Sequence, residues 1–435
     1  MVEIFVDKFR KFKILVSPLA AFFLGTALTC CAYALLSSIL GIRLSQNGVS
    51  NSNVGIILSL YYVGYVGAAN SAYRIINRVG HIRAFTAFLS IFSSFTLLHY
   101  FSGNMYFWGI LRLMEGYCIG SATMCLESWL NTRANNKNRG IIMSLYMVTT
   151  YMGAGMGQVL LNIPDPNGIT IYILISILFS IALVPISLTA LPTPDITVHE
   201  NMPLKKLYQK TPVGVLGCFI SGWMVGSFYT LGTVFSERIG LNIQETSMFM
   251  LFVILGGMIA QIPMGRLSDK MDRRKVMMGS CAALFFIAPT FKYLQPYGHL
   301  FIELGAIMIG FCMFVIYPIC VSHVNDLVTD SERVQASGKL ILLQGTGLIT
   351  GPVVVGFVMD HFGSFSYLLC FSFVCCIFVL FTMRHMRIKP DIDYVSNTPT
   401  SPVPVEVTQA FEELATKDSL IERIMKSRKR KENIN

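Results

Sequence analysis

The stretch Gly265-Arg-Leu-Ser-Asp-Lys-Met-Asp-Arg-Arg274 lies between two long apolar runs of the chain. A weaker copy, residues 73–83, lies 192 residues earlier in the same kind of setting. A basic loop that occurs once in each half is typical of a two-fold duplicated membrane transporter. The pattern therefore predicts a duplicated membrane protein, and it carries little information about the cargo.

The composition excludes a water-soluble globular protein. Hydrophobic residues make up 53% of the 435 residues, charged residues make up 13%, and the mean hydropathy is +0.58. A soluble globule of this length needs more polar residues to cover its surface. We therefore expect the chain to lie in a lipid bilayer.

Apolar segments long enough to cross a bilayer recur along the chain. A spanning helix needs about 20 apolar residues, and ten uncharged stretches are of about that length. Two further spans are identified less directly. Residues 276–291 form only a short apolar run, and residues 106–130 are apolar but carry Arg112, Glu115 and Glu127. The runs do not alternate between apolar and polar residues, which excludes barrel strands. We predict an all-α membrane protein with twelve transmembrane helices in two pseudo-symmetric six-helix bundles.

The lysines and arginines predict the orientation. If the N-terminus is cytoplasmic, 30 of the 34 fall in segments on the cytoplasmic side, as the positive-inside rule requires. Both termini are then cytoplasmic, and the net charge of +10 needs no nucleic-acid partner. The predicted divisions are a cytoplasmic N-terminus (1–13), an N-terminal six-helix bundle (14–191), a cytoplasmic linker (192–210), a C-terminal six-helix bundle (211–384) and a cytoplasmic tail (385–435).

Two motifs resemble those of a known family. The stretch from Gly265 to Arg274 resembles the Gly-x-Leu-Ala-Asp-Arg-x-Gly-Arg-Arg loop of the major facilitator superfamily, and residues 112–120 resemble its fourth-helix pattern Arg-x-x-x-Gly-x-x-x-Gly. The resemblance covers about residues 14–384. It implies the superfamily's twelve-helix fold and alternating access between the two sides of the membrane.

Shorter strings point to one branch of that family. Residues 78–83, 127–131, 322–326 and 351–352 are similar to the bacterial YcaD-like branch, whose substrates are poorly defined. The resemblance implies a multi-pass protein of the bacterial cytoplasmic (inner) membrane.

The loop motif predicts a gate at the cytoplasmic ends of the helices. Glycine permits a sharp turn, an acid is favoured near a helix N-terminus, and adjacent arginines can bind carboxylates on neighbouring helices. The candidate gate residues are Arg78, Gly80, Arg83 and Glu127 in the first half and Gly265, Asp269, Arg273, Arg274 and Asp326 in the second.

We expect each half to close with its own ion pairs. The predicted pairs are Arg78 or Arg83 with Glu127, and Arg273 or Arg274 with Asp326. The alternative is that all of these are solvated charges at the membrane interface. The first copy departs from the motif, because Asn77 replaces its acid and Tyr73 replaces its glycine, so the gate of the first half is the weaker prediction.

Charged residues inside a membrane span are costly and point to function. Arg112 and Glu115 are three positions apart on one predicted helix, so that they can form an ion pair. In the family, this arginine resembles one associated with coupling or substrate contact, which suggests that Glu115 takes up a proton and releases Arg112. The alternative is a permanent structural pair, since a buried pair is costly to break.

By resemblance, the substrate binds at the membrane midplane between the halves. The candidate substrate-binding or coupling residues are Arg112, Glu115, Tyr33, Trp223, Tyr229, Tyr317 and His323. His323 is a candidate for a gate hydrogen bond or for a proton site. For the aromatic residues the alternative is ordinary packing or anchoring at the interface.

The function predicted from these features is secondary active transport of a small organic solute, with proton-coupled export preferred. Proton-coupled uptake by symport stays open, as does a non-transporting receptor or scaffold on the same fold. Motifs of intramembrane enzymes are missing from the sequence, and the 11 cysteines lie within predicted spans without metal-site spacing. We expect a monomer that uses the proton gradient and needs no cofactor, metal or nucleic acid.

The C-terminal tail is a separate element. Residues 390–404 contain four prolines and cannot continue a helix. Residues 407–425 have apolar positions at helical spacing, and a basic run follows them. Two interpretations stay open: an amphipathic helix that touches the membrane surface or a partner, and a disordered, solvated tail.

Overall fold

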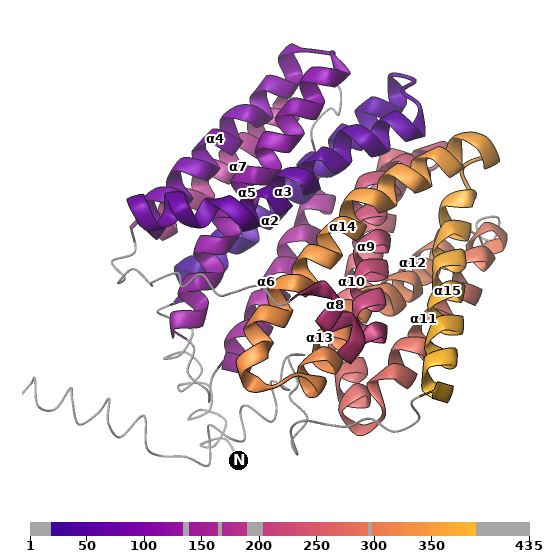
Figure 1. Ribbon diagram of the computed structural model, residues 1–435. Helices are drawn as coiled ribbons and strands as arrows, with labels where there is room; N and C mark the ends of the chain where they lie inside the picture. Colours follow the sequence, from indigo (N-terminus) through magenta and orange to yellow (C-terminus); the bar gives the residue numbers. More distant parts are fainter. Residues whose placement is uncertain (1–18, 134–138, 164–167, 189–202, 295–297, 389–435) are drawn as a thin grey trace, which may run out of the picture.

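The computed structural model describes residues 19–133, 139–163, 168–188, 203–294 and 298–388. These residues form long helices gathered into two groups, which lie on the left and the right of Figure 1. The predicted tail helix lies outside the described residues, as do the predicted N-terminal segment 1–13 and most of the linker. The first group contains α2 (Ala20–Gln46), α3 (Asn51–Val79), α4 (His81–Phe101), α5 (Met105–Arg133), α6 (Arg139–Leu160) and α7 (Thr170–Ser187).

A short helix, α8 (Leu204–Lys210), precedes the second group. That group contains α9 (Pro212–Arg238), α10 (Ile243–Lys270), α11 (Arg273–Leu294), α12 (His299–Met313), α13 (Ile316–Leu327), α14 (Asp330–Phe362) and α15 (Ser366–Ile388). α12 and α13 together make one membrane pass.

The helices account for the predicted number of passes. Ten spans are long and apolar enough to cross a membrane, with α12 and α13 counted together. α5 and α6, with 29 and 22 residues, are also long enough. The described residues therefore contain twelve passes, six on each side of α8, as predicted.

The tenth pass is broken where the sequence suggested one continuous helix. α12 ends at Met313 and α13 begins at Ile316. Pro318 lies in the first turn of α13, where a missing N–H is tolerated, whereas within a continuous helix its ring would clash with the carbonyl of Phe314. The proline therefore explains the break.

The two halves repeat the same close packing of helices. A Cβ added at Gly64 or Gly116 would overlap the backbone of α5 or α3 respectively, and one added at Gly256 or Gly310 would overlap the backbone of α12 or α10. Glycine is needed at these positions because the backbones touch. Gly64 and Gly256 are 192 residues apart, which is also the offset between the two loop motifs.

The loop motif is more helical than its glycine suggested. α10 continues through Gly265 to Lys270, so that only Met271 and Asp272 connect it to α11. Gly265 is buried inside the helix and is not the residue that turns the chain. In the first half Gly80 does turn the chain, with φ of 88° between α3 and α4, a backbone conformation that favours glycine.

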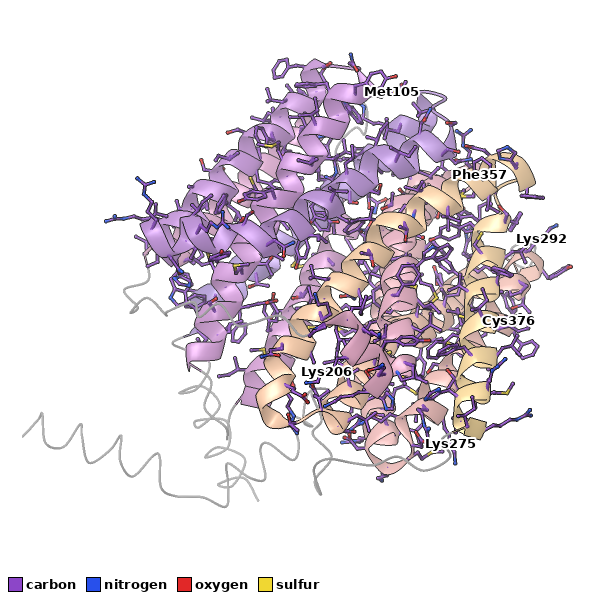
Figure 2. The ribbon with its side chains drawn as sticks, viewed as in Figure 1. Met105, Lys206, Lys275, Lys292, Phe357 and Cys376 are labelled. Carbon is purple, nitrogen blue, oxygen red and sulfur yellow. The ribbon has the colours of Figure 1, made fainter. Side chains whose placement is uncertain are left out.

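Most of the described lysines and arginines lie at the helix ends on one side of the molecule. Figure 2 shows Lys206 and Lys275 at one end and Met105 at the other. We call these the predicted cytoplasmic end and the predicted outer end.

The halves are joined near the predicted outer end. Three of the hydrogen bonds there run from Ser37 Oγ to Tyr229 O (3.1 Å), from Arg238 Nη2 to Val49 O (3.3 Å) and from Asn162 Nδ2 to Ser247 Oγ (2.8 Å). α3 and α14 also pack against each other across the halves, since a Cβ at Gly55 would overlap the backbone at Pro352. These contacts close the outer end of the structure.

α8 is held against the second half by one carboxylate. Glu332, at the start of α14, accepts hydrogen bonds from Lys206 at 2.8 Å and Lys210 at 2.7 Å. These two ammonium groups lower the pKa of Glu332 to about 2, from an ordinary value of 4.5. A lowered pKa means that the contribution to stability is present above about pH 4.5 and is lost as the pH falls toward 2.

We therefore expect the distance between α8 and α14 to stay constant from pH 5 to pH 8. Glu332→Gln should loosen α8 throughout that range, because the charge is removed. The gain is small for such exposed pairs, so the measurement is a distance distribution between spin labels on the two helices. Glu303→Gln on α12 is the control, and an unchanged distribution in Glu332→Gln would refute the role of this contact.

Candidate functional site

A buried ion cluster lies within the first half, toward the predicted outer end. Arg112 Nη1 on α5 donates a hydrogen bond to Glu115 Oε2 at 2.8 Å. The two side chains are 1% and 0% exposed. The structure therefore contains the predicted pair, and the pair is shut off from solvent.

The cluster has a third member that the sequence did not indicate. His99 on α4 places Nδ1 3.4 Å from Glu115 Oε1, and its side chain is 0% exposed. The same nitrogen lies 3.1 Å from the carbonyl oxygen of Phe95, and the ring packs edge-on against Trp108. A histidine in the last turn of a helix gave no signal, because only tertiary packing brings α4 beside this part of α5.

Aromatic rings separate the ion cluster from the space between the halves. The guanidinium of Arg112 lies over the ring of Tyr61, 4.7 Å from its centroid, in a cation–π contact. Tyr61 in turn stacks on Tyr33 of α2 with centroids 4.7 Å apart. Tyr61, which the sequence analysis did not single out, thus contacts both Arg112 and the predicted site residue Tyr33.

Tyrosines from both halves face one another near the middle of the molecule. Tyr151 of α6 and Tyr229 of α9 both pack against the ring of Phe314, with centroids 5.8 and 6.1 Å away, and Tyr229 also interacts electrostatically with Tyr33 of α2. Tyr317 of α13 interacts electrostatically with Tyr65 of α3. We call this group of five residues, Tyr33, Tyr65, Tyr151, Tyr229 and Tyr317, the tyrosine chamber.

Glu127 lies beside the tyrosine chamber and forms no gate pair with Arg78 or Arg83. It accepts a hydrogen bond from Tyr146 Oη at 3.3 Å and interacts electrostatically with Tyr65 and Tyr317. Its side chain is nevertheless exposed, which places an accessible carboxylate between the halves. Glu127 lies two turns before the last residue of α5, so it faces the chamber from the predicted cytoplasmic side.

The predicted pairing of Glu127 with Arg78 or Arg83 is therefore wrong. Both arginines are exposed, and within the described part of the chain neither makes a hydrogen bond or an ion pair. The position that corresponds to Arg273 is His81, whose ring packs on Trp129 at 5.6 Å. An aromatic contact thus occupies this position in the first half, where the first copy of the motif has neither the arginine of position 273 nor the acid of position 269.

The second half has the predicted ion pair. Arg273 Nε donates to Asp326 Oδ2 at 2.6 Å, and the two side chains are 3% and 2% exposed. Arg273 Nη1 also reaches Ser268 Oγ at 3.0 Å and Asp269 Oδ1 at 3.1 Å. Arg274 binds Asp272 at 2.7 Å. The bonds of Arg273 to Ser268, Asp269 and Asp326 thus tie α10, α11 and α13 together. The gating role of this contact remains a prediction.

Two predicted substrate residues lie elsewhere. Trp223 is buried within the second half and packs edge-on against Phe371 of α15, because the α9 face that carries it turns toward α14 and α15. His323 is buried on α13 near Asp272, Arg273 and Arg274. It therefore belongs with the gate residues and lies outside the tyrosine chamber.

A cross-half lock at the predicted outer end was missed by sequence reasoning. Asp360, in the last turn of α14, accepts hydrogen bonds from the backbone N–H groups of Asn51 and Ser52, each at 2.8 Å, and from the Ser52 hydroxyl. Those N–H groups open α3, so the helix dipole favours the carboxylate. Ser50, the N-cap residue of α3, accepts a hydrogen bond from Asn53 N–H within its own helix, whereas Asp360 is 309 residues from Asn51 in the chain.

A family model and similar proteins of known sequence both point to one transporter family. The model of the Major Facilitator Superfamily matches residues 22–259 and 214–425. The chain is also 24% identical over 384 residues to an uncharacterized MFS-type transporter YcaD of Escherichia coli O17:K52:H18, covering 86% of this chain and 97% of the relative. The YcaD protein of Escherichia fergusonii is 23% identical over 381 residues, with 85% and 96% covered.

Solved structures with a similar fold are also transporters by name. A variant of the nucleoside transporter NupG superposes with a TM-score of 0.74 at 14% identity, covering 84% of this chain and 99% of that one. A bacterial homolog of the human lysosomal transporter Spinster, in an inward-facing and unoccupied conformation, gives 0.71 at 12% identity, covering 88% and 99%. At these identities the likeness concerns the fold alone.

Proposed function

Because the chain belongs to the Major Facilitator Superfamily and is a multi-pass membrane transporter, we propose that it couples proton movement to the export of a small organic solute across the bacterial cytoplasmic membrane. The observation that carries this proposal is the ion cluster of His99, Arg112 and Glu115. Its side chains are buried, and yet it contains charged groups. Such charges are costly inside a membrane and are retained for function.

The cluster has the parts that proton coupling requires. Protonation of Glu115 would remove the charge that holds Arg112 Nη1 at 2.8 Å. His99, 3.4 Å from Glu115, is a group through which a proton can reach or leave the carboxylate. The released Arg112 would shift on the ring of Tyr61, which stacks on Tyr33. This chain of contacts links the proton site to the tyrosine chamber.

The tyrosine chamber suits small amphipathic solutes. Its members offer aromatic faces and hydroxyl groups, and Glu127 adds an accessible carboxylate. A carboxylate beside aromatic rings favours a cationic solute. Glu127 lies toward the predicted cytoplasmic side, and the outer end is closed by Asp360, so that solute would enter from the cytoplasm. An exporter and an uptake symporter both pass through such a conformation, so export stays our proposal and uptake by symport stays the alternative.

The test is solute flux in proteoliposomes under an imposed pH gradient. The panel includes amphipathic cations, neutral drugs, amino acids, sugars and nucleosides, the last because one structural neighbour is named a nucleoside transporter. Glu115→Gln mimics the protonated acid. It should abolish net flux driven by the gradient and preserve exchange of solute at equal pH, since exchange needs no release of the proton.

Matched controls separate coupling from folding. Glu303→Gln, on α12 of the second half, should leave gradient-driven flux unchanged. Loss of both net flux and exchange in a folded Glu115→Gln would indicate a structural pair, and unchanged net flux would refute coupling through Glu115. Flux with the opposite dependence on the gradient would indicate uptake. A folded wild-type protein that moves no solute would favour a receptor or scaffold.

A further inference from the structure

A cavity of about 300 Å³ lies at the predicted cytoplasmic end of the second half. It is formed between α8, the start of α9 and the end of α15. Its lining residues are Tyr208, Gln209, Pro212, Phe381, Arg384, His385 and Ile388. None of these residues belongs to the ion cluster, the tyrosine chamber or the gates.

The cavity has an apolar wall and a basic rim. Pro212, Phe381 and Ile388 form most of the wall, and Ile388 is 66% exposed. Arg384 and His385 supply the rim, and the described residues of the lining include no acidic side chain. His385 stacks on Phe381 with centroids 6.3 Å apart, which holds the imidazole against the wall.

The depth of the cavity matches the boundary between lipid tails and headgroups. Arg384 is 18 residues after Ser366, the first residue of α15, so it lies about 27 Å along the helix. The hydrocarbon layer is about 30 Å thick. Tyr208 is 48% exposed at the same level, as expected for an aromatic residue at the interface. The apolar wall continues along α15 through Leu380, which is 58% exposed.

We propose that this cavity binds the headgroup of an anionic phospholipid from the cytoplasmic leaflet. Arg384 binds the phosphate with its planar guanidinium, and the Tyr208 hydroxyl and Gln209 amide are further hydrogen-bond donors. The first acyl chain follows the exposed apolar surface of α15. The positive charge of Arg384 on the rim selects anionic over zwitterionic lipids, because a choline group would meet Arg384.

The bound lipid connects α8 with α15, the last helix of the second half. α8 is already fixed on its other side, where Leu207 is fully buried and Lys210 binds Glu332. The lipid would join the open side of α8 to α15. Anionic lipid in the leaflet therefore adds a contact that holds the linker helix in place.

The test is native mass spectrometry of the full-length protein released from micelles. The probes are phosphatidylglycerol, phosphatidylcholine of the same chains, and inorganic phosphate. We expect phosphatidylglycerol to remain bound in preference to phosphatidylcholine, and Arg384→Gln to weaken it about fivefold, the effect of one basic group near an anionic headgroup. Arg384→Gln with Tyr208→Ala should weaken it further. Lys275→Gln, an exposed cation at the same end (Figure 2), is the matched control and should change nothing.

Three outcomes would overturn the proposal. The first is equal retention of the two lipids, and the second is an equal effect of Arg384→Gln and Lys275→Gln. The third is full displacement of the lipid by inorganic phosphate, which would assign the cavity to free phosphate. A photo-reactive phenylalanine at position 208 checks the occupant: cross-links to lipid support the site, whereas cross-links only to the chain's own residues contradict it.

Discussion

Replacing Arg273 with leucine is expected to lower the free energy of unfolding by about 3–5 kcal/mol, the usual cost of removing one partner of a buried ion pair. The change leaves Asp326, whose side chain is 2% exposed, without a guanidinium at 2.6 Å. It also removes the bonds to Ser268 and Asp269, so that three helices lose a common anchor.

The measurement is the unfolding midpoint in mixed detergent and SDS micelles, followed by circular dichroism. Lys275→Gln is the control, since Lys275 is an exposed cation two residues farther along α11. Replacing Arg273 and Asp326 together with leucine should recover most of the loss, because both buried charges are then removed together. A single Arg273→Leu variant as stable as Lys275→Gln would show that the pair is not an anchor.

The second large effect is expected at the contact between α3 and α14. A Cβ added at Gly356 would overlap the carbonyl oxygen of Asn51, and one added at Gly55 would overlap that of Pro352. A backbone cannot yield as a flexible side chain does, so alanine at either position should force the outer ends of the halves apart. The same shift should strain the bonds from Asp360 to the start of α3.

The measurement is the rate at which a membrane-impermeant maleimide labels Ser37→Cys. Ser37 is 5% exposed and is bonded across the halves to Tyr229. We expect Gly356→Ala to raise the labelling rate about tenfold, which corresponds to a shift of about 1.4 kcal/mol toward the outward-open state.

Gly67→Ala on α3 and Gly338→Ala on α14 are matched controls, because nothing lies within 4 Å of a Cβ at either position. They should label at the wild-type rate. An unchanged rate in a folded Gly356→Ala variant would show that the outer contact does not limit access. Asp360→Asn should raise the rate less than Gly356→Ala, because its amide oxygen still accepts one backbone hydrogen bond.

Local features were predictable where both partners are close in the chain or follow a motif. Arg112 and Glu115 are three residues apart on one helix, so helical geometry alone brings them together. Arg273 and Asp326 were linked through the loop motif and its resemblance to a family. The pairing of Glu127 failed because the first copy of the motif has lost its acid and holds His81 where the second copy holds Arg273.

Other parts of the site depend on how each helix is rotated about its axis. The composition of α9 is apolar on all sides, so nothing in its sequence indicates that Trp223 faces α15 while Tyr229 faces the tyrosine chamber. A helix surrounded by other helices has no polar face from which its orientation could be predicted. Packing of small residues such as Gly222 against α14 determines that rotation.

The sequence by itself determined the membrane environment, the twelve passes and the duplication, because these follow from total hydrophobicity, segment length and a repeated motif. Only the tertiary structure decided that His99 joins Glu115, that Glu127 faces the tyrosine chamber and that Asp360 caps α3. The physical reason is distance along the chain. Hydrophobic burial is non-directional and selects which residues lie inside, whereas the polar contacts of the site depend on which helices become neighbours and at what rotation.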